Sequence, residues 1–144
     1  MAYHIAFVHK KFVEMFVNGQ KNIESRLSIN TPSCWSVEKD DVILFKEVGG
    51  EIRCAGKIAA VHKFDRLTYP DINVLASLFS RNVGVSEYDD YWIQKSKSRF
   101  AVFMEIEKIV EVQYPRHLTP RGIQSAWLSN FSIDQSFRVL FENL

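Results

Sequence analysis

The sequence is poor in the residues from which metal centres and disulfide scaffolds are built. It has only two cysteines, Cys34 and Cys54, and they form no metal-binding or disulfide pattern. The four histidines are also scattered, and none has a Cys, Asp or Glu at ligand spacing: His4, His9, His62 and His117. A glycine-rich phosphate loop is missing as well. We therefore expect reduced thiols, no metal site and no cofactor.

The chain also lacks an excess of charge of either sign. It has 18 basic and 17 acidic side chains and a formal net charge of +1. Tight non-specific binding of duplex nucleic acid requires many Lys and Arg contacts to phosphates, so this balance disfavours such a function. A local basic patch is still compatible with this near-neutral net charge.

Long hydrophobic runs are the third absence. No apolar segment approaches the roughly 18 residues that span a bilayer. The first ten residues have neither the apolar core nor the cleavage site of a signal peptide. We expect a cytoplasmic protein without membrane association, and the oligomeric state is left open.

The composition is that of an ordered globular domain. Hydrophobic residues make up 47% of the 144 positions, and no linker rich in Pro, Gly or Ser divides the chain. We therefore predict one domain over residues 1–144. Eleven Phe and three Trp are more than a core usually requires. They indicate either aromatic surface for stacking on bases or a core rich in Phe.

The first half of the chain reads mostly as β-structure. Residues 10–18 have apolar positions at helical spacing, and Gly19 is suited to end that helix. Gly49-Gly50 predicts a tight hairpin in which both glycines have positive φ. Gly56 predicts a bend in the strand that follows. Strands are expected over residues 3–8, 22–27, 41–47 and 51–64.

The second half begins with helices and returns to a strand. A helix starts near Pro70 and ends at Gly84, and Ser86 is the expected N-cap of the next one. Residues 99–112 alternate as a long strand, and Thr119-Pro120 opens a short helix towards Trp127. This order predicts an α+β fold, in which five to six strands form a small mixed or antiparallel β-barrel with two to four flanking helices.

Residues 19–26, Gly-Gln-Lys-Asn-Ile-Glu-Ser-Arg, resemble the signature of the ASCH family, Gly-x-Lys-x-x-Glu-x-Arg. The segment follows a helix and leads into a strand, as it does in that family. Residues 40–45, 53–61 and 132–140 resemble further family segments, so that the resemblance covers nearly the whole chain. It implies a PUA-like barrel with a cleft beside the signature strand.

The resemblance implies two alternative functions. ASCH domains are generally supposed to bind RNA, and some hydrolyse a nucleoside amide or cut RNA. The first alternative is therefore a module that binds single-stranded RNA or a modified nucleobase. The second is a ribonuclease or an amidohydrolase of acylated cytidine with Lys21 and Glu24 as catalytic residues. The chain departs from the family's amidohydrolases at Glu24, where they have Thr, and Ser25 is expected on the opposite face of the strand. A domain that binds another protein is a third alternative.

Individual residues of the candidate site have competing interpretations. Glu24 and Arg26 leave one face of their strand, with Lys21 just before it. Spacing alone favours a surface ion pair, whereas the resemblance favours a ligand site. Trp35, with Cys34 in the polar loop 28–39, is expected to be exposed and to stack on a base. We considered Tyr91 and Trp92 for the same role, but their helical spacing favours a core.

The C-terminal segment supplies the last candidates. Gln135, Ser136 and Arg138 offer amide, hydroxyl and guanidinium groups. They either contact the ligand in the same cleft or cap and pack the C-terminus. We predict a positive patch around Lys21, Arg26 and Arg138. The predicted ligand-binding set is Lys21, Glu24, Arg26, Trp35, Gln135, Ser136 and Arg138.

Overall fold

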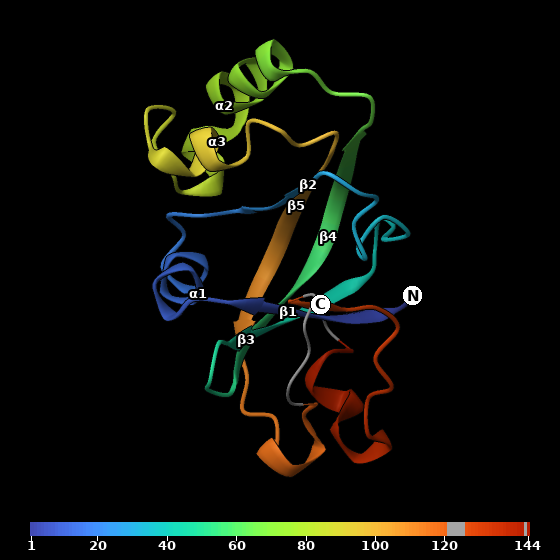
Figure 1. The fold of residues 1–144 in the computed structure, drawn as a ribbon. Coiled ribbons are helices and arrows are strands. Elements are labelled where there is room, and N and C mark those ends of the chain that lie inside the picture. Colours follow the sequence, from blue (N-terminus) through green and yellow to red (C-terminus); the bar gives the residue numbers. More distant parts are fainter. Residues whose placement is uncertain (121–125, 143) are drawn as a thin grey trace.

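The computed structural model describes residues 1–120, 126–142 and 144, and these form one curled sheet with flanking helices (Figure 1). The sheet has six strands in the order β2-β5-β4-β3-β1-β6. Strands β1 and β3 are parallel, and the other neighbours are antiparallel. The strands are β1 (Tyr3–Val8), β2 (Ile23–Ser28), β3 (Val42–Glu47), β4 (Ile52–Phe64), β5 (Phe100–Glu111) and β6 (Trp127–Leu128).

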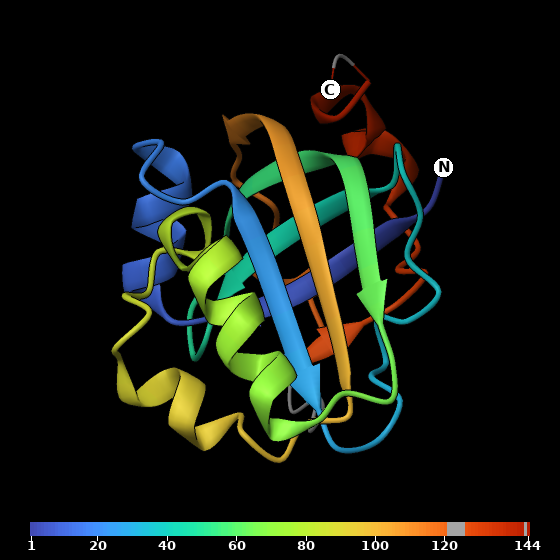
Figure 2. The same cartoon turned by 90° about the horizontal axis from the view of Figure 1, so that it is seen from above.

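Three α-helices and two 3₁₀ turns accompany the sheet. In Figure 2 the helix α2 lies across the sheet beside β2 and β5, while α1 lies near one end of β2. The elements are α1 (Lys10–Val17), α2 (Tyr69–Val83), α3 (Asp90–Gln94), η1 (Arg116–Leu118) and η2 (Gln135–Leu140). The prediction of an α+β fold with a mixed, barrel-like sheet of five to six strands and flanking helices is therefore confirmed, and the sheet curls into a half-barrel. No described helix combines the length and apolarity that crossing a bilayer requires.

The curl of the sheet depends on its two long strands. The pairing of β4 with β5 changes register on both sides of Lys57, and such bulges bend a strand. Gly56 lies at the first shift, where a Cβ atom would be 2.3 Å from Ile106 Cγ2. The predicted bend at Gly56 is confirmed, and its cause is the close approach of β5.

The phenylalanines fill the core rather than the surface. Phe16 and Phe45 pack together inside the half-barrel, with ring centroids 4.3 Å apart. Phe103 stacks on Phe79 of α2, and Phe141 from the C-terminal segment packs edge-on against Tyr3. Among the described residues no Phe or Trp is exposed. Of the two interpretations, the core rich in Phe is therefore the right one.

Two local predictions are wrong in detail. Only Gly49 of the hairpin has positive φ, at 73°, and Gly50 N donates to Glu47 O at 2.9 Å. The turn is therefore not of the primed type. The N-cap of α3 is Asp89 rather than Ser86, because the Asp89 carboxylate accepts from Tyr91 N at 2.8 Å.

Neither end of the short helix predicted from Thr119-Pro120 towards Trp127 is helical. Thr119 has an extended backbone after η1, and Trp127 belongs to β6. The rest of that prediction falls on residues 121–125, which lie outside the described residues. The two helix-ending glycines are confirmed: Gly19 follows the C-cap of α1 and Gly84 is the C-cap of α2, with φ of 82° and 85°.

Candidate functional site

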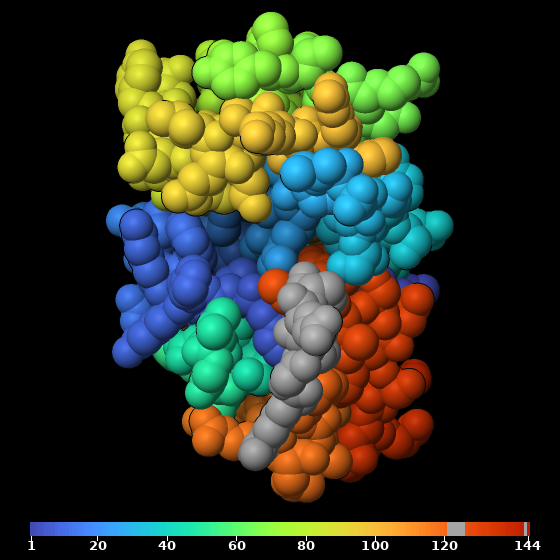
Figure 3. All heavy atoms as spheres, viewed as in Figure 1, coloured from blue at the N-terminus to red at the C-terminus, as the bar shows by residue number. Residues whose placement is uncertain are grey.

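A pocket of about 540 Å³ lies where the half-barrel does not close. We call this gap between the free edges of β2 and β6 the seam, because these two strands end the sheet order. Residues 24–28 of β2 line one wall, and Trp127 of β6 lines the opposite one. Figure 3 shows the molecule hollowed between the segment that contains α3, in yellow, and the blue N-terminal segments. α1 and α3 complete the walls through Phe12 and Tyr91.

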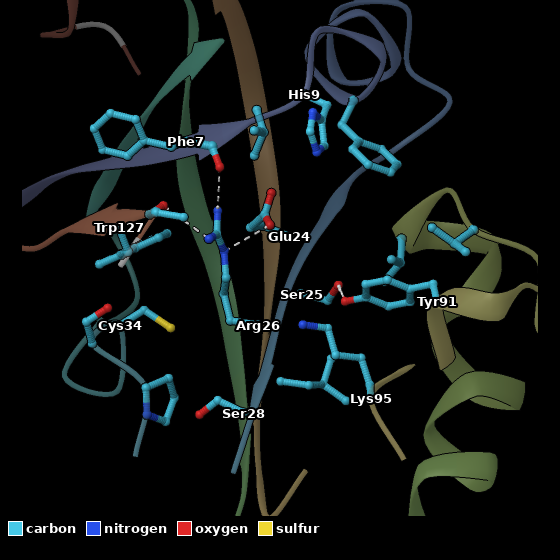
Figure 4. Close-up of a pocket in the computed structure, with 18 of the residues that line it drawn as sticks. Phe7, His9, Glu24, Ser25, Arg26, Ser28, Cys34, Tyr91, Lys95 and Trp127 are labelled. Atoms are coloured by element: carbon cyan, nitrogen blue, oxygen red, sulfur yellow. Dashed lines mark hydrogen bonds and ion pairs between the residues drawn. The ribbon is translucent and has the colours of Figure 1, made fainter. Parts of the chain in front are cut away.

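Glu24 and Arg26 point from β2 into this pocket on the same face, as predicted (Figure 4). Arg26 Nε lies 3.2 Å from Glu24 Oε1. Glu24 is only 5% exposed. Its second oxygen, Oε2, has no hydrogen-bond partner among the described residues. A buried acceptor without a partner is costly, and a donor from a ligand that reached this oxygen would relieve that cost.

The guanidinium of Arg26 makes contacts across the seam. Its Nη1 donates to Ala126 O at 3.1 Å, and its Nη2 donates weakly to Phe7 O at 3.5 Å. Its Cζ lies 5.4 Å from the ring centroid of Trp127, which is within range of a cation–π interaction. One side chain of β2 thus contacts both β1 and β6, which β2 does not reach through backbone pairing.

Lys21 is a buried cation in the wall of the pocket, with only 4% of its surface exposed. Its Nζ donates to Val83 O at 2.5 Å and lies 5.2 Å and 5.1 Å from the rings of Phe12 and Phe16. Burial lowers the pKa of Lys21, the charge of Glu24 opposes this, and Arg26 adds to it. Arg26 is therefore the direct partner of Glu24, while Lys21 acts on it through the electric field.

A second polar group was missed by the sequence analysis. Ser25 Oγ and Tyr91 Oη are 3.1 Å apart, and Lys95 Nζ lies 5.7 Å from the Tyr91 ring centroid. Burial raises the pKa of Tyr91, and burial together with Arg26 lowers the pKa of Lys95. The side chain of Ser25 does lie on the other face of the strand, where Tyr91 is. It still lines the pocket, because β2 is an edge strand and the pocket wraps around its free edge.

The loop before β3 differs from the expectation of an exposed segment. Cys34 is buried and lines the pocket, and burial raises the pKa of its thiol to about 11. Trp35 is half-buried, with its ring 5.5 Å from that of Phe100 and nearly perpendicular to it. Lys63 Nζ lies 5.8 Å from the Trp35 ring. Trp35 is not among the residues that line the pocket, so Tyr91 takes its place as an aromatic in the wall.

The structure does not bring the C-terminal candidates to this pocket. Gln135, Ser136 and Arg138 are exposed residues of η2, and none of them lines it. Ser136 N and Oγ both donate to Asp134 as a local cap. The Phe137 ring packs against Tyr114 on this side of the domain. The predicted positive patch is thus divided, with Arg138 apart from the other two cations.

The pocket has an excess of positive charge despite the near-neutral chain. Among the described residues, three cationic side chains line it, Lys21, Arg26 and Lys95, against the one carboxylate of Glu24. Two positive charges are therefore left without an acidic partner in the wall. No group of three or more His, Cys, Asp or Glu side chains suited to a metal occurs within the described part of the chain.

Comparison with known proteins places this architecture in a class. No protein-family model matches the chain, and no curated protein matches it. Among solved structures, the crystal structure of ASCH from Zymomonas mobilis superposes with a TM-score of 0.70 at 14% identity, over 96% of this chain and 93% of that one. A mutant form of the same protein gives a TM-score of 0.67 at 14% identity, over 97% and 96%.

The molecule is thus an α+β half-barrel domain with a charged pocket at its seam. Its fold is that of the ASCH domain, as the resemblance of residues 19–26 implied.

Proposed function

We propose that the protein binds RNA or a nucleotide by taking one base into the pocket at the seam. The observation that carries this proposal is the buried, unpartnered Oε2 of Glu24 in a wall that otherwise bears cations. The volume of about 540 Å³ lies within the range of small-ligand pockets.

The arrangement favours a base with an exocyclic amino group. An ionised carboxylate only accepts hydrogen bonds, and the amino groups of cytosine and adenine only donate. The neighbouring ammonium and guanidinium groups of Lys21 and Arg26 are donors that suit the acceptor atoms beside such an amino group. Glu24 would then select the base, and the cations would orient it.

The charge of the pocket favours a phosphorylated ligand. Lys95 has no hydrogen bond or ion pair among the described residues, apart from its contact with the Tyr91 ring. Figure 4 shows its side chain beside β2, across from Arg26. A phosphate would neutralise the excess of two positive charges and relieve the repulsion between Lys95 and Arg26.

Calorimetric titration with mononucleotides tests the proposal. CMP or AMP should bind at least about tenfold more tightly than UMP, the scale of one hydrogen bond to a charged group. The unphosphorylated nucleoside should bind more weakly than its monophosphate. Equal affinity for all three monophosphates, or binding of none, would overturn the proposal.

A second candidate is hydrolysis of RNA or of an acylated nucleoside. It is favoured by the lowered pKa of Lys21 beside Glu24, since an amine that loses its proton more readily is a better base. Incubation with short RNAs and N-acylated cytidine, followed by chromatography of the products, distinguishes it. Turnover by the wild type that Glu24→Gln or Lys21→Met abolishes would establish hydrolysis in place of simple binding.

A further inference from the structure

We propose that a second nucleotide subsite continues the pocket at the seam, so that the protein binds two consecutive nucleotides of a single strand. This inference rests on the proposed function. The subsite is a cleft of about 540 Å³. Its principal lining residues are Ile29, Leu67, Tyr69, Lys97 and Arg99.

The two cavities follow one another along both walls. Ser28 and Lys95 line the first pocket, and the next residues along the chain, Ile29 and Ser96, line the second. Consecutive Cα atoms are about 3.8 Å apart, so the two cavities adjoin at these two points of the chain. Arg99 N donates to Ser28 O at 3.0 Å, which ties the second cleft to the end of β2.

Tyr69 gives this cleft an aromatic surface. Its side chain belongs to the first residue of α2 and is 60% exposed. The helix start is fixed by a capping box, in which Asp71 accepts from Thr68 N at 2.8 Å and from Thr68 Oγ1 at 2.9 Å. The ring is therefore presented from a defined backbone, and an exposed ring of this kind can stack on any base.

The charge of the cleft matches a nucleic-acid backbone. Lys97 and Arg99 line it, and no carboxylate of the described residues does. Lys97 is exposed and has no hydrogen bond or ion pair among the described residues. Arg99 donates from Nη1 to Leu67 O at 3.0 Å, which leaves its other donors for a phosphate. A phosphodiester that leaves the first pocket past Lys95 would meet both cations.

The same features disfavour an acidic peptide as the occupant. A peptide would suit Lys97 and Arg99, but its carboxylates would meet the buried carboxylate of Glu24 in the adjoining pocket. Cations interleaved with a stacking ring, next to a pocket with an acceptor for a base amino group, are the chemistry of a single-stranded nucleic acid.

The test compares AMP with the dinucleotide ApA by calorimetry, with the deoxy dinucleotide as a further arm that separates RNA from DNA. ApA should bind the wild type at least about tenfold more tightly than AMP, the scale of one added stacking contact. Tyr69→Ala should remove about fivefold or more of the ApA affinity and leave that of AMP within about twofold. Tyr69→Phe should keep the ApA affinity, because the ring remains.

Tyr88→Ala is the matched control, since Tyr88 is 87% exposed but lines neither cavity. It should change neither affinity. If AMP binds and ApA gains nothing, or if Tyr69→Ala weakens both ligands equally, the second subsite is wrong while the proposed function stands. If neither ligand binds the wild type, both proposals are wrong.

Discussion

The carboxylate of Glu24 and the guanidinium of Arg26 lie 3.2 Å apart at the edge of β2, yet their pairing leaves Glu24 Oε2 and Arg26 Nε without a hydrogen bond among the described residues. The approach is close, but it does not satisfy either group. A ligand that donates to Glu24 and accepts from the neighbouring cations would complete the hydrogen bonding of both groups. The pair is thus suited to hold a polar ligand rather than to stabilise the fold alone.

Glu24→Gln should separate binding from catalysis. The substitution keeps the shape and most of the hydrogen-bonding capacity but removes the charge. The affinity for CMP or AMP should fall by about 1–2 kcal/mol, the scale of one hydrogen bond to a charged group. If Glu24 were a general base, turnover would fall by roughly 100-fold with little change in affinity.

The control for this variant is Glu38→Gln. Glu38 is exposed and lies outside the pocket, so its neutralisation should leave the affinity unchanged. An equal loss in both variants would mean that the effect comes from overall charge rather than from the site.

Arg26→Ala should weaken both binding and stability. The guanidinium contacts Phe7 O and Ala126 O across the seam, and its loss would leave Glu24 buried without its partner. We expect the free energy of unfolding to fall by about 3 kcal/mol, as when a buried pair loses one member. Urea denaturation measures this.

A double variant checks the cause of that loss. Glu24→Gln combined with Arg26→Ala should destabilise by less than the sum of the two single changes, because the second change then acts on a pair already broken. Strict additivity would show that the ion pair contributes nothing.

Local patterns in the sequence predicted most elements of the fold. The apolar alternation of residues 100–106 and the helix-ending glycines Gly19 and Gly84 depend on neighbours along the chain. The cap of α3 was misassigned because two capping residues compete. Ser86 uses its hydroxyl to accept from Tyr88 N, and Asp89 caps the helix.

The composition of the site depended on contacts that no local pattern encodes. The signature identified Lys21, Glu24 and Arg26, but the edge position of β2 and the packing of α2 against β2 and α3 bring Ser25 and Tyr91 to the same pocket. The polar composition of residues 28–39 predicted an exposed loop, but Cys34 is buried there and Trp35 is half-buried. The position of η2 is set by the packing of rings such as Phe137 on Tyr114. Ser136 and Arg138 of η2 therefore lie away from the pocket at the seam.

Lys21→Met should change how stability depends on pH. Burial lowers the pKa of Lys21 in the folded state below its ordinary value of 10.5. Between the lowered pKa of the folded state and about 10.4, Lys21 therefore binds more protons in the unfolded chain than in the folded one. Its contribution to the free energy of unfolding rises with pH in that window. The variant should lose this rise in urea denaturation followed from neutral pH towards about pH 10. Its affinity for AMP should also fall, since a donor in the pocket is gone.

The matched control is Lys39→Met, which neutralises an exposed lysine outside the pocket. It should keep the slope of the wild type. The same slope in Lys21→Met and the wild type would contradict a lowered pKa.

Asp41→Asn should weaken the junction of β1 with β3 and remove an acid-sensitive part of the stability. Asp41 is buried and accepts three hydrogen bonds, from Ala2 N at 3.0 Å, Glu38 N at 3.1 Å and His4 Nε2 at 2.8 Å. His4 Nδ1 in turn accepts from Asn130 N at 3.2 Å, which leaves the proton of neutral His4 on Nε2. The amide of the variant has one acceptor oxygen in place of two, so we expect a loss of about 1–3 kcal/mol at pH 7.

The acid dependence follows from the direction of the pKa. Burial opposes the ionisation of Asp41, but the hydrogen bonds from His4, Ala2 and Glu38 outweigh it and lower the pKa of Asp41 below its ordinary value of 3.8. Stability from this group is therefore fully present above the pKa of the unfolded chain, about 3.9, and is lost as the pH falls through the lower folded value. Urea denaturation from pH 6 to pH 2.5 should show the wild type and Asp41→Asn converging at the acid end. Asp65→Asn, at an exposed carboxylate, should run parallel to the wild type. If the difference between Asp41→Asn and the wild type stayed constant down to pH 2.5, the network around Asp41 would not favour its ionised form.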